Sequence, residues 1–300
     1  MTSSAKLPTL SWADLHSHSL ISDGILTPEQ VVQRAAAAGV RVLALTDHDT
    51  VAGVARARAA APAGLEVLPG IEISASHGSK DVHVLGYFNP ARLGVWDVFQ
   101  AKRKAARLDR FDAIMDRLQA LGAPVDRESA LAERARDPNL VPGRPHLARA
   151  LIQAGHVETM QEAFERFLGG DAPAYVPTRG LSVADAIEQI HSAEGIAVLA
   201  HPIYGDLDQD LEAFRDSGLD GVEAFHFSHD PEQREHFAAR AEDLGLLLSG
   251  GSDFHGQADD PEGELAHERL GQARLPIAAY EAFADALVRR AGYSASLLGR

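Results

Sequence analysis

Residues 14 to 18 read Asp-Leu-His-Ser-His and follow a β-prone run that starts near Thr9. Side chains two positions apart on a strand point to the same face, so His16 and His18 can bind one ion together. Two surface histidines with ordinary hydrogen bonds would produce the same pattern. The interpretation therefore depends on what stands at the ends of the other predicted strands.

Similar polar groups recur along the chain. Asp23 lies in the loop S-D-G, and His48 lies in T-D-H-D, directly after the apolar run VRVLAL. His201 follows IAVL in the motif A-H-P, and Asp253 and His255 follow LLL in G-G-S-D-F-H. Burying such groups without partners is costly, and barrel enzymes assemble their sites at the carboxyl ends of strands. These motifs therefore indicate one shared site.

Glu72 and His83 each stand alone between two β-branched apolar residues. If the apolar neighbours face the core, both polar side chains point the other way, toward a barrel mouth or toward solvent. With them, nine potential ligands fall where predicted strands end. We predict that they form a multinuclear metal site: His16, His18, Asp23, His48, Glu72, His83, His201, Asp253 and His255.

Short β-rich runs alternate with helical runs over residues 9–90 and again from about residue 181, which predicts an α/β fold with a parallel sheet. Residues 91–175 show long helical patterns instead. We therefore predict a discontinuous barrel domain, residues 9–90 and 176–300, with a helical insertion, residues 91–175, that covers the mouth of the active site. A last amphipathic helix, beyond about residue 275, should pack on the outside.

The composition narrows the class of protein. A chain of 300 residues with 45% apolar content can build a full core, and its lack of cysteine excludes disulfides, iron–sulfur clusters and thiolate zinc sites. The net charge of −15 disfavours stable binding of duplex nucleic acid. No run approaches the roughly 20 apolar residues that a membrane span needs. We expect a cytoplasmic protein with no membrane contact and no obligate protein partner.

As a group, the motifs H-x-H, T-D-H, G-x-E, A-H-P and S-D-x-H resemble the PHP (polymerase and histidinol phosphatase) superfamily. G-R-P-H at residues 143–146 and Y-V-P at residues 175–177 are similar to the branch of stand-alone phosphoesterases that act on 3′,5′-nucleotide bisphosphates and on the 5′ ends of short RNAs. The resemblance covers nearly the whole chain. It implies a distorted, seven-stranded (β/α) TIM-like barrel with an inserted helical subdomain.

The same resemblance implies three divalent metal ions. One would be bound by His16, His18, Glu72 and Asp253, a second by Glu72, His83 and His201, and a third by Asp23, His48 and His255. Some members carry histidine where this chain has Asp23, and the harder carboxylate favours manganese, magnesium or iron over zinc. We expect manganese, with iron, zinc and magnesium as alternatives.

The activity that the resemblance implies is removal of the 3′-phosphate from a 3′,5′-nucleotide bisphosphate such as pAp, which leaves a nucleoside 5′-monophosphate. The same attack would make the protein a 5′–3′ exoribonuclease on short 5′-phosphorylated RNA. A hydroxide that bridges the metal ions would attack phosphorus, without a protein nucleophile. Two alternatives stay open: a phosphatase of another small phosphomonoester, such as histidinol phosphate, and a non-catalytic PHP module that binds or scaffolds.

Six further residues are candidates for contacts with the substrate: Arg107, Arg110, Arg144, His146, His226 and His229. A guanidinium can bind two phosphate oxygens at once, although basic residues on a helix often form only a solvated face. Asp14, Asp47 and Asp49 adjoin predicted ligands, and such carboxylates often orient a metal-binding imidazole through its second nitrogen. We predict this supporting role for all three.

Overall fold

The computed structural model describes residues 9–10, 13–132, 137–178, 180–256, 270–272 and 275–293. Seven strands form one sheet in the order β2-β3-β4-β5-β6-β7-β8, and a separate pair joins β1 (Thr9–Leu10) to β9 (Leu275–Pro276). The seven strands are β2 (Ala13–Asp14), β3 (Val42–Leu45), β4 (Glu66–His77), β5 (Lys80–Tyr87), β6 (Ile196–Leu199), β7 (Gly221–His226) and β8 (Leu247–Gly251).

The seven-stranded sheet curves into a nearly closed barrel. Its two edges meet where the backbone N–H of Leu15 donates to the carbonyl of Gly250 over 3.1 Å, and where Ser17 bridges Phe254. At this seam a Cβ on residue 251 would lie only 2.2 Å from the Cβ of His16, so the close approach requires Gly251. The predicted α/β barrel is confirmed.

One strand departs from the expected parallel sheet, because β5 runs antiparallel to both β4 and β6. A tight turn at Gly78, with φ of +60°, joins β4 to β5 and leaves no room for a crossover helix. β4 also continues beyond Glu72 to His77, so the expectation that Glu72 lies at a strand end is wrong. Glu72 instead lies within a long hairpin that rises past the barrel rim.

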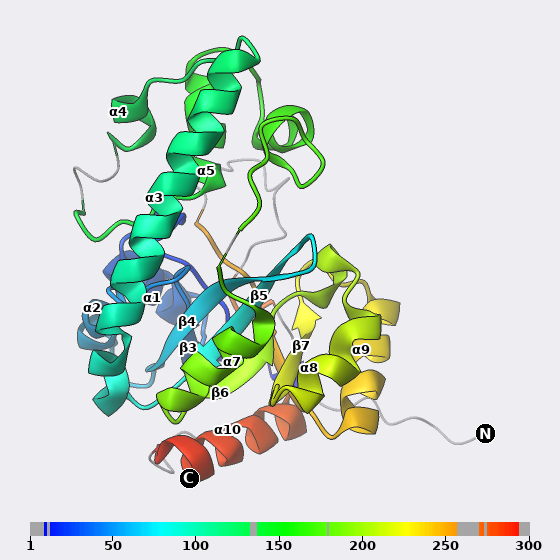
Figure 1. Cartoon of the computed structure of the whole chain (residues 1–300). Helices are drawn as coiled ribbons and strands as arrows, with labels where there is room; N and C mark the ends of the chain where they lie inside the picture. The colour runs from blue at the N-terminus through cyan, green and yellow to red at the C-terminus, as the bar shows by residue number, and fades with distance from the viewer. Residues whose placement is uncertain are drawn as a thin grey trace.

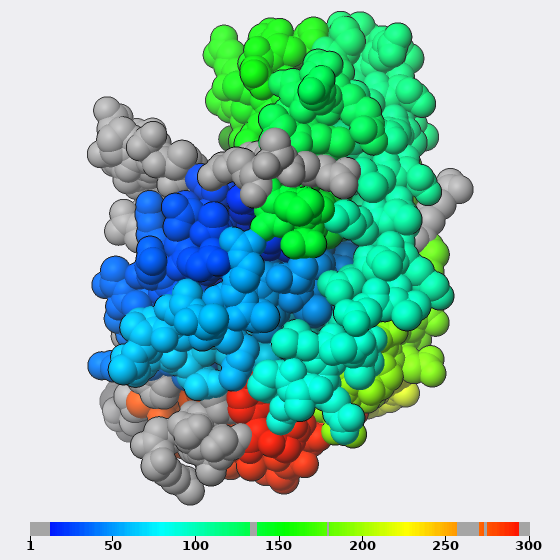
Figure 2. All heavy atoms as spheres, turned by 90° about the vertical axis from the view of Figure 1, so that its left-hand side faces the viewer, coloured from blue at the N-terminus to red at the C-terminus, as the bar shows by residue number. Residues whose placement is uncertain are grey.

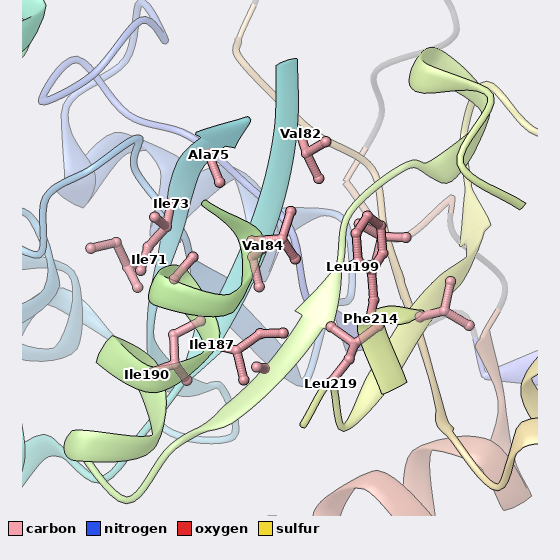
Figure 3. Close-up of a cluster of buried hydrophobic side chains, with 14 of the residues drawn as sticks. Ile71, Ile73, Ala75, Val82, Val84, Ile187, Ile190, Leu199, Phe214 and Leu219 are labelled. Atoms are coloured by element: carbon pink, nitrogen blue, oxygen red, sulfur yellow. The ribbon is translucent and has the colours of Figure 1, made fainter. Parts of the chain in front are cut away.

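Helices pack around the sheet and across one end of the barrel. The barrel helices are α1 (Pro28–Ala37), α2 (Val54–Ala60), α7 (Val183–Ser192), α8 (Leu211–Asp216), α9 (Pro231–Leu244) and α10 (Ile277–Ala291). A capping box between Ser182 and Asp185 starts α7, whose Ile187 packs against Ile71 and Val84 in the buried cluster of Figure 3. Among the described residues, no helix combines the length and apolar character that crossing a bilayer needs.

The last helix, α10, lies across the base of the barrel (Figure 1). Its Phe283 and Leu287 are buried in one cluster with Leu85 and Val198, which share the inner face of the sheet with Glu72 through the strand register. α10 therefore closes the lower end of the barrel, and the expectation that it packs on the outside is wrong. Its amphipathic pattern shows that one face is buried but not against which surface.

The described residues between β5 and α7 form helices: η1 (Pro90–Trp96), α3 (Asp97–Ala120), α4 (Arg127–Ala130), α5 (Arg144–Gln153), α6 (Met160–Ala163) and η3 (Phe164–Leu168). They have a hydrophobic cluster of their own, which includes Phe111, Leu147 and Phe167. Trp96 and Phe99, at the start of the segment, are buried in the barrel cluster with Ile71. Figures 1 and 2 show α3 running up along the side of the barrel, with the rest of the segment standing above the barrel, at the end opposite α10.

Candidate metal centre

Glu72 lies at the middle of a group of imidazoles inside the upper end of the barrel. Its Oε1 lies 2.8 Å from Nδ1 of His83 and 3.1 Å from Nε2 of His201. Its Oε2 lies 3.0 Å from Nδ1 of His48 and 3.1 Å from Nε2 of His18. Although burial opposes ionisation, the surrounding imidazoles, first those of His48 and His83, hold the pKa of Glu72 well below its usual value. The carboxylate is therefore an anion that several ligands share.

The first predicted ligand set comes together as a compact group. His16, His18, Glu72 and Asp253 each contribute one ligand atom, and these atoms all lie within 4.8 Å of one another. Oδ1 of Asp253 lies 3.2 Å from Nε2 of His16 and 3.1 Å from Nε2 of His18. Asp253 adopts a left-handed backbone with φ of 52°, which is unfavourable for a residue other than glycine. Such strain is typical of residues held in place at functional sites.

The third predicted set also converges, with one addition. Oδ2 of Asp23 lies 3.5 Å from Nε2 of His48, and Oδ1 lies 3.3 Å from Nε2 of His255. His18 belongs to this group as well, because its Nδ1 lies 3.7 Å from Asp23 Oδ1 while its Nε2 faces Glu72. His18 therefore stands between the two groups.

The second predicted set surrounds Oε1 of Glu72. Nδ1 of His83 and Nε2 of His201 lie 3.3 Å apart, and both face that oxygen. His48 is grouped with Glu72 and His83, so it too lies between two groups. His83 reaches the site although it lies near the start of β5, because β5 runs antiparallel to its neighbours.

The donors fit divalent cations. Nε2 of His16 lies 3.1 Å from Nε2 of His18, and both nitrogens face ionised carboxylates. His48 Nδ1 and Glu72 Oε2 are buried 3.0 Å apart without a hydrogen bond between them, as expected of ligand atoms that serve cations. Nitrogen and oxygen donors of this kind suit manganese, iron, zinc or magnesium. These buried groups of imidazole and carboxylate are consistent with a multinuclear metal site.

Glu223, on β7, was missed by the sequence analysis. It is fully buried, and its Oε1 and Oε2 lie 3.1 and 3.2 Å from Nδ1 of His16. Oε2 also accepts a hydrogen bond from the backbone N–H of His201 over 2.9 Å. The available signal was a single carboxylate within the apolar strand D-G-V-E-A-F. Glu223 therefore orients His16 and His201, two predicted ligands, through hydrogen bonds to their ring and backbone N–H groups.

The three aspartates predicted to orient imidazoles bind other groups. Asp14 accepts hydrogen bonds from the backbone N–H groups of Ser252 and Gly271, at 2.9 and 2.8 Å. Asp47 accepts from the N–H of Ser19 at 2.7 Å and from the hydroxyl of Ser22 at 2.8 Å. These two carboxylates fix the backbone and the serines beside the ligands, which differs from the ring contact that we predicted.

Asp49, the third of these aspartates, binds arginines of α3. Arg107 Nε donates to its Oδ2 over 2.5 Å, and Arg103 Nε donates to its Oδ1 over 3.2 Å. Although burial raises the pKa of Asp49, the two guanidinium groups lower it to about 2. Asp49 therefore ties α3 to the loop that carries His48.

A second carboxylate, Asp81, joins α3 to α5. Its Oδ2 accepts from Nη2 of Arg110 over 3.2 Å and lies 3.5 Å from Nη2 of Arg144. Burial and the neighbouring Arg144 lower the pKa of Arg110 to about 10. The side chains of Arg107 and Arg110 are only 11% and 17% exposed, so they do not form a solvated helix face. They line a cavity of about 410 Å³ together with Ser74, Arg103, Arg117 and residues 176–178.

Three predicted histidine contacts lie at different places. His226 Nε2 lies 3.5 Å from Asp253 Oδ2, next to the metal centre. Nδ1–H of His229 donates to the carbonyl of Ala224 over 2.9 Å, one layer behind His226. Nδ1 of His146 accepts from the N–H of Gly143 over 3.1 Å and starts α5.

Comparison with known proteins gives three findings. The sequence profile of the PHP domain matches residues 14–225. A 5′-3′ exoribonuclease of Haemophilus influenzae is 38% identical over 81% of this chain and 89% of its own length. A 3′,5′-nucleoside bisphosphate phosphatase of Chromobacterium violaceum is 37% identical over 81% of this chain and 86% of its own length.

Solved structures agree with the sequence matches. A protein of Bifidobacterium adolescentis, described as a metal-dependent phosphoesterase, superimposes with a TM-score of 0.80 at 33% identity. The match covers 96% of this chain and 98% of that one. The similarity therefore includes the helical segment as well as the barrel.

Proposed function

This chain belongs to the PHP domain family and is a metal-dependent phosphoesterase, and from this premise we propose that its substrate is a 3′,5′-nucleoside bisphosphate. Hydrolysis would release the 3′-phosphate and leave a nucleoside 5′-monophosphate. Short RNA with a 5′-phosphate presents the same arrangement of groups, so trimming from the 5′ end would use the same site.

The observation that carries this proposal is an excess of arginine, buried or partly buried, beside the metal centre. Arg103 and Arg107 share Asp49, and Arg110 and Arg144 share Asp81, so four guanidinium groups face two carboxylates. The surplus positive charge suits a phosphate that is bound but not attacked. A plain monoester, such as histidinol phosphate, has no second phosphate to occupy this region.

The two regions lie within one substrate length of each other. Ser74 follows Glu72 by two residues on β4, so both side chains point to the same face of the sheet. Ser74 Oγ accepts a hydrogen bond from Nη2 of Arg107 over 2.6 Å and lines the arginine cavity. A nucleotide with phosphates on both sides of its ribose can therefore contact the metal ligands and the arginines together.

We propose that three ions are bound, one by each predicted ligand set, and that manganese is the native metal. When bound, these ions lower the pKa of a coordinated water and neutralise charge on the phosphoryl oxygens. The chain's own carboxylates at the centre face imidazoles, and none needs to serve as a nucleophile. The arginines hold the second phosphate and so orient the ester that is cleaved.

The helical segment, residues 91–175, would form the cover of this site. The N–H of Val141 donates to the carbonyl of Ile21 over 2.7 Å, and Arg149 Nη1 donates to the carbonyl of Asp23 over 3.4 Å. Both contacts join the segment to the loop that carries a predicted ligand. This supports a discontinuous barrel with an insertion that closes over the substrate.

A substrate panel with the manganese-loaded enzyme tests the proposal. We expect hydrolysis of adenosine 3′,5′-bisphosphate to exceed that of adenosine 3′-monophosphate and of p-nitrophenyl phosphate. Equal rates on all three would contradict the bisphosphate assignment. Elemental analysis that finds metal without turnover of any ester would instead favour a binding or scaffolding module.

A further inference from the structure

An aromatic side chain stands at the open edge of the metal centre. Tyr204 is 62% exposed, whereas Tyr87, Tyr280 and Tyr293 are buried. Its ring centroid lies 5.1 Å from that of His201, a predicted metal ligand, and 5.9 Å from that of His226. Tyr204 therefore packs one part of its ring on the centre and leaves the rest accessible to a bound molecule.

A tight turn holds this tyrosine in place. Tyr204 lies in η4 (Pro202–Gly205), and its N–H donates to the carbonyl of His201 over 3.1 Å. The residues that bracket the turn, His201 and Asp206, have positive φ angles of 26° and 47°. Lys80 Nζ, from the β4–β5 hairpin, donates to the carbonyl of Asp206 over 2.8 Å. Surrounding contacts maintain this unfavourable backbone, so the ring is presented in a defined position.

The two cavities beside the metal centre differ in charge, so they favour different parts of a substrate. Next to η4, a cavity of about 430 Å³ extends along α9, and its lining combines apolar side chains, among them Ile203, Leu207 and Phe237, with the carboxylates of Asp206, Asp208, Asp230 and Glu232. The arginine cavity is lined by residues of α3, and α3 and α9 flank the barrel on opposite sides in Figure 1. Phosphate is attracted to the arginines and repelled by the carboxylates. The side of the mouth at Tyr204 therefore suits an uncharged part of the substrate.

We propose that Tyr204 stacks against the nucleobase of the substrate, which rests on the function proposed above. A base is flat and uncharged at neutral pH, and every base offers a π face, so this contact binds nucleotides without selecting one base. Tyr204 would thus distinguish a nucleotide from a base-free sugar phosphate. The arginines would bind the phosphate of a nucleotide and that of a base-free sugar phosphate alike.

Binding measurements separate this role from packing on His201. We would titrate adenosine 5′-monophosphate and ribose 5-phosphate into manganese-loaded wild type, Tyr204→Phe, Tyr204→Leu and Tyr204→Ala by calorimetry. Tyr204→Phe keeps the aromatic face, and Tyr204→Leu keeps apolar bulk over His201. We expect Tyr204→Ala and Tyr204→Leu to weaken binding of the nucleotide about 5- to 150-fold. Binding of ribose 5-phosphate should not change, and Tyr204→Phe should match wild type.

Parallel kinetics with adenosine 3′,5′-bisphosphate and its abasic 3′,5′-bisphosphate analogue distinguish the two proposals. Loss of kcat/KM with the adenosine substrate alone would support stacking. Equal losses with both substrates, or reduced metal content in Tyr204→Leu, would overturn it in favour of support for His201. If wild type hydrolyses neither bisphosphate, the proposed function fails, and the calorimetric comparison still decides whether Tyr204 binds a base.

Discussion

Nδ1 of His16 lies 3.1 Å from Oε1 of Glu223, and both side chains are fully buried. A carboxylate at this distance accepts the ring N–H, which leaves Nε2 as the lone-pair donor that faces Glu72 and Asp253. The contact therefore sets the tautomer of the imidazole at the seam of the barrel. It also joins β7 to the motif at the start of the chain, more than half the sequence away.

Glu223→Gln should lower the affinity for metal about 10- to 100-fold. Glu223 accepts hydrogen bonds from two N–H groups, that of the His16 ring and that of the His201 backbone. The amide of glutamine has only one oxygen to accept both. Metal titration of the apoprotein would measure the effect. Glu212→Gln is the control, because that side chain is 63% exposed. Equal affinity in the two variants would show that Glu223 does not orient His16.

Glu72→Gln should lower turnover on the order of 10³-fold or more, since charge stabilisation by the ions is worth several kcal/mol. The change removes the anion that lies between the first and second ligand sets, so we expect less than three equivalents of metal by elemental analysis. Glu66→Gln, on the same strand but 40% exposed, serves as control. Full metal content in Glu72→Gln would contradict a shared ligand.

Arg144→Ala should raise KM for a nucleoside bisphosphate about 10- to 150-fold, because a hydrogen bond to a charged group contributes about 1.5–3 kcal/mol. The kcat should change less, since the second phosphate is held equally in the ground and transition states. The variant should behave like wild type on p-nitrophenyl phosphate. Arg127→Ala provides the control, because Arg127 is 51% exposed and pairs with Asp112. Unchanged KM would exclude Arg144 from phosphate binding.

Acid should destabilise the protein through His229. Burial lowers the pKa of His229 to about 4, so the folded form keeps the ring neutral, whereas the unfolded chain protonates it near its ordinary pKa of 6.5. Between these two values the unfolded state binds more protons, so this contribution to stability is lost as the pH falls from about 6.5 to about 4. Thermal unfolding of His229→Phe should depend less on pH in this window than unfolding of wild type. If the stability of the two proteins changed equally with pH in this window, the lowered pKa of His229 would be contradicted.

The strand and helix alternation could be predicted because its signals are local. The helix that begins at Pro28 has Thr27 as its cap, and buried runs such as IAVL form strands. The direction of β5 could not be predicted from its apolar pattern, because alternating side chains look the same in parallel and antiparallel strands. The tight turn at Gly78 decides the direction of β5. The burial of α10 against the base of the barrel likewise depends on which surface remains uncovered once the strands have closed.

The sequence by itself determined the ligand types, because H-x-H, A-H-P and S-D-x-H place imidazoles and carboxylates where predicted strands end. The predicted side chains form adjoining groups, one with Asp23 and the others with Glu72. Only the tertiary structure decided their partners. Barrel closure brings distant segments of the chain together. It places Glu223 against His16 and Asp49 against Arg107, and the tight turn of η4 places Tyr204 against His201. Residue type and local periodicity specify what a side chain can do, whereas a pair contact also depends on the path of the chain between its two members.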